Sequence, residues 1–277
     1  MAKARNRALA FLRSSHPIPC LAVASFAALF AFVNSLSLGR SSLIFLAVLL
    51  QQISVGLSND WLDAKRDKAA GRTDKPTVNG LVQVSQIRAG SLIAAGLAEL
   101  VASLIGFGPA VVMLLMLIFG WAYNVGMKNN WSSAIPYALG FGSVPVFTSL
   151  AAPQPYWVPT WVVVVSALLG VSAHFANALP DMIADKLTGV NALPHILGQR
   201  ISALVIAGTA MLATLLTVSQ SPHLALAVAV AGVAITVGLV GFASVLSLRA
   251  KPPRVVFPLL ILASLTNVIL VVLGTKK

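Results

Sequence analysis

The chain has 277 residues, of which 58% are hydrophobic and only 9% are charged. A soluble domain of this size would lack polar surface, so the composition excludes an ordinary soluble protein and indicates a membrane protein. The formal net charge of +12 does not indicate a nucleic-acid partner, because the basic residues follow the pattern of a membrane topology.

Nine apolar segments are predicted to span the membrane, because a spanning helix needs about 20 mostly apolar residues. In chain order they cover residues 18–36, 43–57, 84–105, 110–125, 134–150, 161–179, 201–218, 224–246 and 255–273. The second, fourth and fifth segments are short, so we expect their polar ends to continue as helix into a cavity or the interface. The whole chain, 1–277, is predicted to be one all-α membrane domain.

The basic residues predict how these helices are oriented. With the N-terminus in the cytoplasm, 16 Lys and Arg residues lie in cytoplasmic segments and only 3 lie on the other side. Such an excess of positive charge is typical of cytoplasmic loops. We therefore expect an integral protein of a bacterial-type inner or plasma membrane, surrounded by membrane lipid, with its N-terminus and functional site on the cytoplasmic side.

Two polar clusters share the frame N-x3-D-x3-D-K-x2-G-x4-P, with corresponding residues 118 positions apart. Their acidic and amide members are Asn59, Asp60, Asp63 and Asp67 in the first cluster, and Asn177, Asp181 and Asp185 in the second. Because an even number of predicted helices separates the clusters, both emerge on one membrane face. This pattern predicts two parallel four-helix halves, about 18–130 and 134–250, followed by a ninth helix at about 255–273. An inverted-repeat transporter would place related elements on opposite faces.

The clustered carboxylates predict a cation site. On a helix, Asp60, Asp63 and Asp67 project from one face, where like charges repel one another. Mg²⁺ is the best candidate, because it prefers oxygen ligands and commonly bridges one or two carboxylates to substrate phosphates. The candidate ligands are all seven clustered residues, with the two Asn residues supplying carbonyl oxygens. The alternative is that the aspartates only pair with basic neighbours in a solvated loop.

Basic residues close to the clusters are candidates for binding phosphate oxygens. They are Arg66, Lys68, Arg72, Lys75, Lys128, Lys186 and Arg200.

These residues resemble the motifs of the UbiA superfamily of intramembrane prenyltransferases. The family carries N-D-x-x-D-x-x-x-D after its second helix and D-x-x-x-D after its sixth, which match the two clusters. The segment Arg72-Thr73-Asp74-Lys75-Pro76 resembles the basic-then-proline tail of the first motif. Tyr123 followed by Lys128 resembles the family's Tyr-x-x-x-x-Lys signal.

The resemblance implies a nine-helix intramembrane bundle with a lateral opening. It also implies Mg²⁺-dependent transfer of a prenyl group from a polyprenyl diphosphate to an acceptor, which we expect to be a small aromatic compound or quinone precursor. Asp60, Asp63, Asp181 and Asp185 then act in catalysis with the metal. Lys128 becomes a diphosphate contact, and the ring of Tyr123 is expected to stabilise the carbocation.

Three further polar residues lie near or within predicted spans. His174 is either a proton acceptor in the cavity or a hydrogen-bonded packing residue. Glu99 is an acid deep in a span, which makes it a functional candidate. Gln52 lies seven residues before Asn59, on the same helical face, and is expected to line the cavity.

Two other functions remain open at this level. An intramembrane terpene cyclase would ionise the same diphosphate at the same metal site but trap the cation on its own double bonds. A transporter would use the carboxylates as an ion or metabolite pathway.

Overall fold

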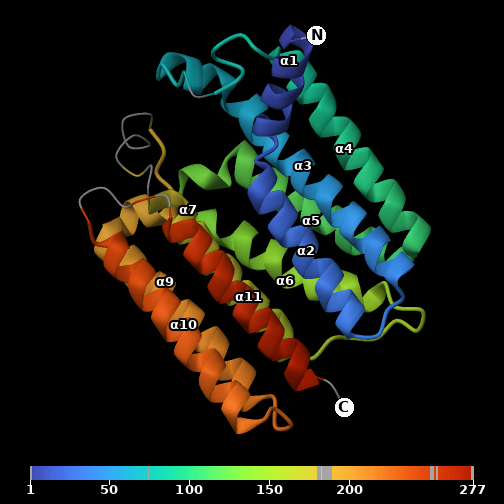
Figure 1. Cartoon of the computed structure of the whole chain (residues 1–277). Coiled ribbons are helices and arrows are strands. Elements are labelled where there is room, and N and C mark those ends of the chain that lie inside the picture. Colours follow the sequence, from blue (N-terminus) through green and yellow to red (C-terminus); the bar gives the residue numbers. More distant parts are fainter. Residues whose placement is uncertain are drawn as a thin grey trace.

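The computed structural model describes residues 2–73, 75–179, 182, 189–249, 253 and 255–275, and all regular structure in these ranges is helical. The all-α prediction is therefore confirmed (Figure 1). The α-helices are α1 (Ala2–Ser14), α2 (Pro17–Val33), α3 (Leu38–Ala69), α4 (Val84–Ile105), α5 (Phe107–Val125), α6 (Ala134–Leu150), α7 (Thr160–Ala178), α9 (Leu193–Ser219), α10 (Leu226–Ser247) and α11 (Val256–Thr275). Two short 3₁₀ helices, η1 (Met127–Asn129) and η2 (Trp131–Ser133), join α5 to α6.

Six of the described helices are long and apolar enough to cross a membrane, namely α3, α4, α5, α7, α9 and α10. A seventh span is added if Asn6–Ser14 and Pro17–Val33, which meet at 60°, are counted as one. The apolar part of α11, Pro258–Gly274, is shorter. The length and composition of the described helices therefore do not confirm nine spans or two four-helix halves, and both stay predictions.

Four apolar clusters are buried among the described residues, and one of them packs α2 against α7, α9 and α11. The largest cluster lies among α2, α3, α4, α5 and α6, and the next lies among α7, α9, α10 and α11. Figure 1 shows these groups as two neighbouring sets of helices. Close approach depends on small residues: a Cβ on Gly170 would lie 2.6 Å from the backbone oxygen of Tyr137, and one on Gly120 would collide with Val55. Large apolar side chains such as Leu104 and Leu226 are exposed on the outside, as lipid contact requires.

Helix α3 is the element that carries the first polar cluster. The side chain of Ser37 accepts a hydrogen bond from the backbone N–H of Arg40 and caps the start of the helix. The helix then continues past the apolar segment to Ala69, as expected from the shortness of that segment. Gly71, with φ 65°, follows its end. The last three turns of α3 therefore present Asp60, Asp63 and Asp67 in fixed relative positions.

A sharp elbow between α1 and α2 packs against the middle of α3. His16 forms the elbow in the left-handed conformation, with φ 54° and ψ 63°. The thiol of Cys20 donates to the Ser15 carbonyl oxygen at 3.0 Å. Gly56 of α3 lies so close to this carbonyl that any side chain at position 56 would overlap with it. This contact fixes His16 beside the first polar cluster.

Candidate active site

Asp60 is almost completely buried, and two basic side chains bind it. Its Oδ1 accepts a hydrogen bond from Lys75 Nζ at 2.7 Å and lies 3.2 Å from His16 Nε2. Lys75 comes from the segment after α3, whereas His16 comes from the α1–α2 elbow. Asp60 thus joins three separate parts of the chain.

Asp63 lies one turn further along α3 and is held by two cations. Its Oδ1 accepts from Lys128 Nζ at 2.5 Å, and its Oδ2 accepts from Arg66 Nη2 at 2.7 Å. Lys128, in η1, is only 5% exposed. Burial lowers the pKa of Lys128 below its ordinary value, while the Asp63 carboxylate counteracts this effect. The predicted pairing of the aspartates with basic neighbours is therefore present, but in a buried setting rather than in a solvated loop.

Asp67 provides an oxygen that a cation could satisfy. Within the described ranges, its buried Oδ2 has no hydrogen-bond partner. Those same ranges contain no group of three or more Asp, Glu, His or Cys residues arranged to hold a metal. A bound Mg²⁺ would therefore need other oxygens to complete its ligands, which agrees with its usual coordination by one or two carboxylates and substrate phosphates.

Asn124 of α5 anchors the start of the cluster, a role that the sequence did not reveal. Its Nδ2 donates to the Val55 carbonyl oxygen at 2.8 Å and to Ser58 Oγ at 2.7 Å. Its Oδ1 accepts from Asn59 Nδ2 at 3.1 Å. Because the amide nitrogen of Asn59 is bound in this way, the side-chain carbonyl oxygen of Asn59 remains available as a ligand atom.

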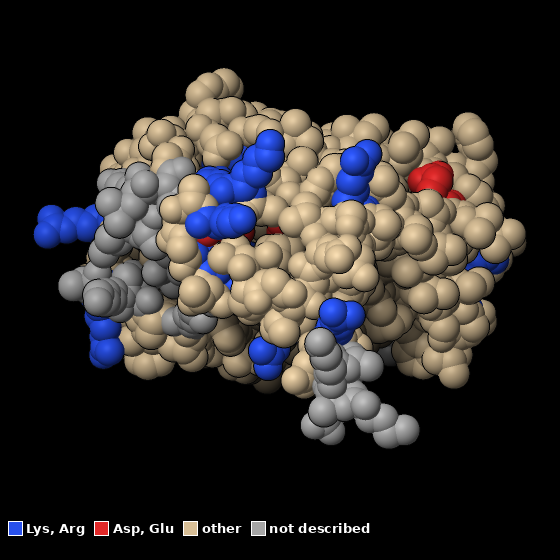
Figure 2. Space-filling view, turned by 90° about the horizontal axis from the view of Figure 1, so that it is seen from above, with Lys and Arg blue, Asp and Glu red and all other residues tan. Residues whose placement is uncertain are grey.

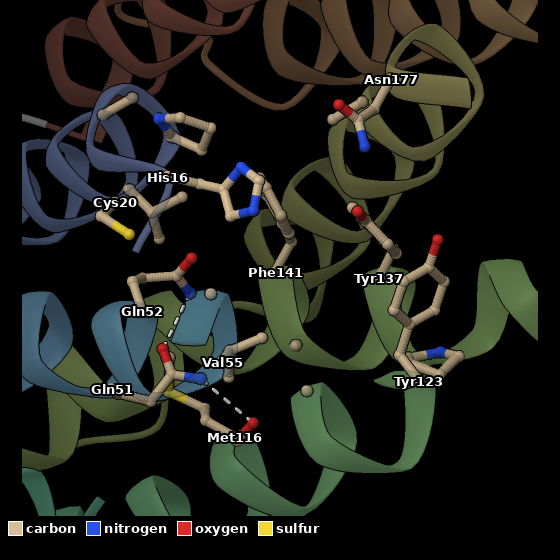
Figure 3. Close-up of a pocket in the computed structure, with 18 of the residues that line it drawn as sticks. His16, Cys20, Gln51, Gln52, Val55, Met116, Tyr123, Tyr137, Phe141 and Asn177 are labelled. Carbon is tan, nitrogen blue, oxygen red and sulfur yellow. Dashed lines mark hydrogen bonds between the residues drawn. The ribbon is translucent and has the colours of Figure 1, made fainter. Parts of the chain in front are cut away.

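A cavity of about 270 Å³ lies next to the cluster. Figure 3 shows His16, Cys20 and Gln52 on one side of it, with Tyr123 and Tyr137 across from them. His16 is the only ionisable side chain other than Cys20 and tyrosine among the described residues that line it, and none of them is Lys, Arg, Asp or Glu. The buried charged cluster on α3 is thus next to a cavity whose described lining has no Lys, Arg, Asp or Glu.

A second, smaller cavity of about 60 Å³ lies deeper in the bundle. The two cavities share part of their lining, namely Val23, Phe26, Phe141, Val144 and Ser264. The remaining walls of the second cavity are almost entirely apolar and include Phe30, Val162 and Val271. The two cavities are therefore neighbours, and the second lies on the apolar side of the first.

An aromatic cluster forms the wall around Tyr123. The ring centroid of Tyr123 lies 5.1 Å from that of Tyr137 and 5.7 Å from that of His174, in both cases edge to face. His174 is 1% exposed, and its Nε2 lies 3.0 Å from Ser133 Oγ. This geometry supports the packing interpretation of His174. Ser133 Oγ also accepts from the backbone N–H of Leu193 at 2.8 Å, which ties η2 to the start of α9.

The structure brings together most of the candidate residues in the described ranges. Asn59, Tyr123 and Asn177 line the main cavity, as does Gln52. Lys68 is exposed, and Glu99, on α4, is not among the residues lining either cavity. Asp181, Asp185 and Lys186 lie outside the described residues.

Figure 2 shows basic side chains gathered beside a hollow in which carboxylates are visible. Arg72 lies in the turn after α3, where its backbone N–H donates to the Asp67 carbonyl oxygen at 3.0 Å. Sequence reasoning missed His16, Asn124 and Tyr137. For His16, a usable signal was its position directly before the prolines that begin α2.

Residues 18–268 match the model of the UbiA prenyltransferase family. The chain is 30% identical over 186 residues, covering 65% of its length and 67% of the relative, to a digeranylgeranylglyceryl phosphate synthase from Methanothrix thermoacetophila. Its fold resembles a UbiA homologue from Aeropyrum pernix K1, with a TM-score of 0.76, 17% identity, and coverage of 91% of this chain and 96% of that one. It also resembles a UbiA homologue from Archaeoglobus fulgidus bound to DMAPP and Mg²⁺, with a TM-score of 0.75, 16% identity, and coverage of 96% and 99%.

Proposed function

Because the chain belongs to the UbiA prenyltransferase family, we propose that it transfers a prenyl group from a polyprenyl diphosphate to a small acceptor within the membrane, with Mg²⁺ as cofactor. The observation that carries this proposal is the junction of two environments. Buried, cation-paired carboxylates on α3 lie directly beside a cavity whose described lining has no Lys, Arg, Asp or Glu. Such a junction suits a substrate with a strongly anionic head and an apolar tail.

The donor set fits Mg²⁺, since it consists of carboxylate and amide oxygens and includes the unpartnered Oδ2 of Asp67. When bound, the metal supplies positive charge that neutralises the diphosphate leaving group. The residues proposed to hold it are Asn59, Asp60, Asp63 and Asp67 of the first cluster and Asn177, Asp181 and Asp185 of the second.

Basic residues beside the carboxylates are proposed to bind the diphosphate. Lys75, Lys128 and Arg66 already contact Asp60 or Asp63, so their remaining N–H donors lie close enough to the cluster to bind phosphate oxygens. Arg72, Lys68 and Lys186 are proposed to add positive charge at the same face. Lys68 is exposed and would bind through its long, flexible side chain.

The reaction begins when the allylic C–O bond breaks and its electron pair leaves with the diphosphate. The cation at the prenyl C1 atom then needs a dry environment, because water would capture it. The walls of the cavity are mostly apolar and limit the access of water, and the ring of Tyr123 lines this space and can stabilise the positive charge. The acceptor supplies the electron pair of the new bond to C1 and then loses a proton.

The prenyl chain is proposed to extend through the main cavity into the second, apolar cavity. The five lining residues that the two cavities share support this route. Phe30, at 7% exposed, lies on the wall of the deeper cavity and is suited to limit the length of the chain. We further propose the nine-span topology of two parallel halves, with the N-terminus and active site on the cytoplasmic side.

A small aromatic compound or quinone precursor is our proposed acceptor. The size of the main cavity and its aromatic wall of Tyr123, Tyr137 and Phe141 support this choice. The archaeal relative is named for a prenylated glyceryl phosphate, so an alcohol of that kind is the second acceptor class to be tested.

The test is a product screen by mass spectrometry on the purified chain in detergent, with Mg²⁺ and prenyl diphosphates of several lengths. Each diphosphate is supplied with aromatic acceptors, with glyceryl phosphate ethers, or without an acceptor. We expect a prenylated acceptor and stoichiometric diphosphate, both lost on chelation of Mg²⁺. Efficient formation of a cyclic hydrocarbon without acceptor would show that the protein is a cyclase and not a transferase. Solute transport in proteoliposomes without diphosphate release would refute an enzymatic role.

A further inference from the structure

Two neighbouring glutamines on α3 present a hydrogen-bond acceptor to the main cavity. Gln51 is buried, and its Nε2 donates to the Met116 carbonyl oxygen of α5 at 3.2 Å. Gln52 Nε2 in turn donates to Gln51 Oε1 at 2.8 Å (Figure 3). Both glutamines line the cavity.

The direction of this chain is fixed by the backbone carbonyl at its end. A carbonyl oxygen can only accept, so Gln51 must turn its NH₂ group toward Met116 and its oxygen toward Gln52. Gln52 must then donate to that oxygen, which leaves its own carbonyl oxygen for the cavity. Among the described residues, no hydrogen-bond donor is recorded for Gln52 Oε1. The cavity therefore contains an acceptor atom of fixed orientation that the protein itself does not use.

The surrounding walls disfavour an anion at this depth. Gln52 lies seven residues before Asn59, about 10 Å along the helix axis from the carboxylate cluster. No Lys or Arg is among the described lining residues of the cavity. A carboxylate placed beside Gln52 would meet its carbonyl oxygen without a Lys or Arg among the described lining, and the one described imidazole there, that of His16, already lies 3.2 Å from Asp60. A charge left unpaired in such a place is costly. A hydroxyl group, in contrast, can donate to Gln52 Oε1.

From this geometry we infer that Gln52 determines acceptor specificity. It selects an acceptor that carries a neutral hydroxyl group and disfavours an acceptor with a carboxylate at the same position. This inference rests on the proposed transferase function and adds to it the chemical class of the acceptor. Gln51 is a positioning residue, because it acts only through the orientation of Gln52.

The test uses three naphthalene probes that differ in one substituent, namely 1-naphthol, 1-methoxynaphthalene and 1-naphthoate. Their binding to the purified full chain in detergent is measured by titration calorimetry, without turnover. The wild-type protein is expected to bind 1-naphthol at least roughly tenfold more tightly than either of the other probes, because only the hydroxyl can donate to Gln52 Oε1. Comparison of the same affinity ratio between the wild-type protein and each variant cancels micelle partition, because the partition of each probe is the same in every titration.

Two variants and one control separate the role of Gln52 from a general effect on packing. In Gln52→Leu, the preference for 1-naphthol over 1-methoxynaphthalene should fall to within about twofold. In Gln51→Leu, the Gln52 amide is free to turn over, so binding of 1-naphthoate should improve relative to 1-naphthol. Gln220→Leu makes the same chemical change at an exposed site outside both cavities and should keep the wild-type ratios.

The inference is overturned if Gln52→Leu keeps the wild-type preference for 1-naphthol over 1-methoxynaphthalene. If Gln52→Leu does not fold, the same holds for an unchanged preference for 1-naphthol over 1-naphthoate in Gln51→Leu. Failure of this inference is distinct from failure of the proposed function. The binding ratios need no turnover, whereas the transferase proposal fails only if the product screen yields no prenylated acceptor.

Discussion

Replacement of Asn124 by Ala should weaken both the fold and the metal site, because this side chain connects α5 to the start of the cluster on α3. The substitution removes hydrogen bonds to the Val55 carbonyl oxygen, to Ser58 Oγ and from Asn59 Nδ2. Interhelical hydrogen bonds in membrane proteins average about 0.6 kcal/mol each, so the expected loss is about 2 kcal/mol. This corresponds to a lowering of the unfolding temperature by roughly 5 °C.

The same substitution releases the amide of Asn59, which is then no longer held in a ligand orientation. Loss of a group that orients a metal ligand typically costs about 10- to 100-fold in metal affinity or activity. We therefore expect the Mg²⁺ concentration for half-maximal diphosphate release to rise about tenfold or more. Thermal unfolding in detergent and a magnesium titration of turnover measure the two effects separately.

Asn267→Ala is the matched control for this prediction. Asn267 is also a fully buried amide, but its Nδ2 donates at 3.0 Å to the Ala263 carbonyl oxygen of its own helix, α11. It lines neither cavity, so its removal should leave the magnesium titration unchanged. If Asn124→Ala lowers stability but keeps the wild-type magnesium requirement, the assigned role in orienting Asn59 is wrong.

Three further substitutions test other parts of the site. Asp63→Ala should reduce turnover by about 100-fold or more, since charge stabilisation in a dry site contributes strongly to rate. The helical circular dichroism should be retained. Near-normal turnover would show that Asp63 has no role in the mechanism. Tyr123→Leu should lower turnover about fivefold to tenfold, whereas Tyr123→Phe should stay close to wild type, because the cation interacts with the ring. Equal losses in both would point to the hydroxyl group instead. Phe30→Ala should shift preference toward a longer diphosphate in a competition assay, and an unchanged preference would place the end of the chain elsewhere.

The sequence predicted those features that depend on local spacing. The i, i+3, i+7 spacing of Asp60, Asp63 and Asp67 placed them on one face of a helix, and α3 presents them in this way. The shortness of the apolar segment before them indicated that the helix continues toward the site. Tyr123 and Gln52 were likewise expected at the cavity from their distances to Lys128 and Asn59, and both line it.

Features that depend on contacts between distant segments were not predictable in this way. His16 reaches Asp60 only because the elbow between α1 and α2 packs on Gly56. Asn124 looked like one more polar residue at a helix end, and nothing in its spacing showed that it binds Asn59. His174 has the right helical spacing to face the cavity, yet its ring is packed against Tyr137 at 4.7 Å between centroids. Periodicity gives the side of a helix but not the neighbour that covers it.

The elbow before α2 also bears on how faithfully the enzyme would complete its reaction. In the described part of the chain, residues 2–14 line neither cavity and look dispensable, but Ser15 and His16, which follow them, are part of the wall of the main cavity. Removal of this segment would admit water to the place where the prenyl cation forms, and water is itself a nucleophile. The shortened protein would still cleave the diphosphate but would release a larger share of free prenyl alcohol. On the proposed function, the N-terminal segment would thus govern the partition between transfer and hydrolysis, a property that the total rate of diphosphate release would not reveal.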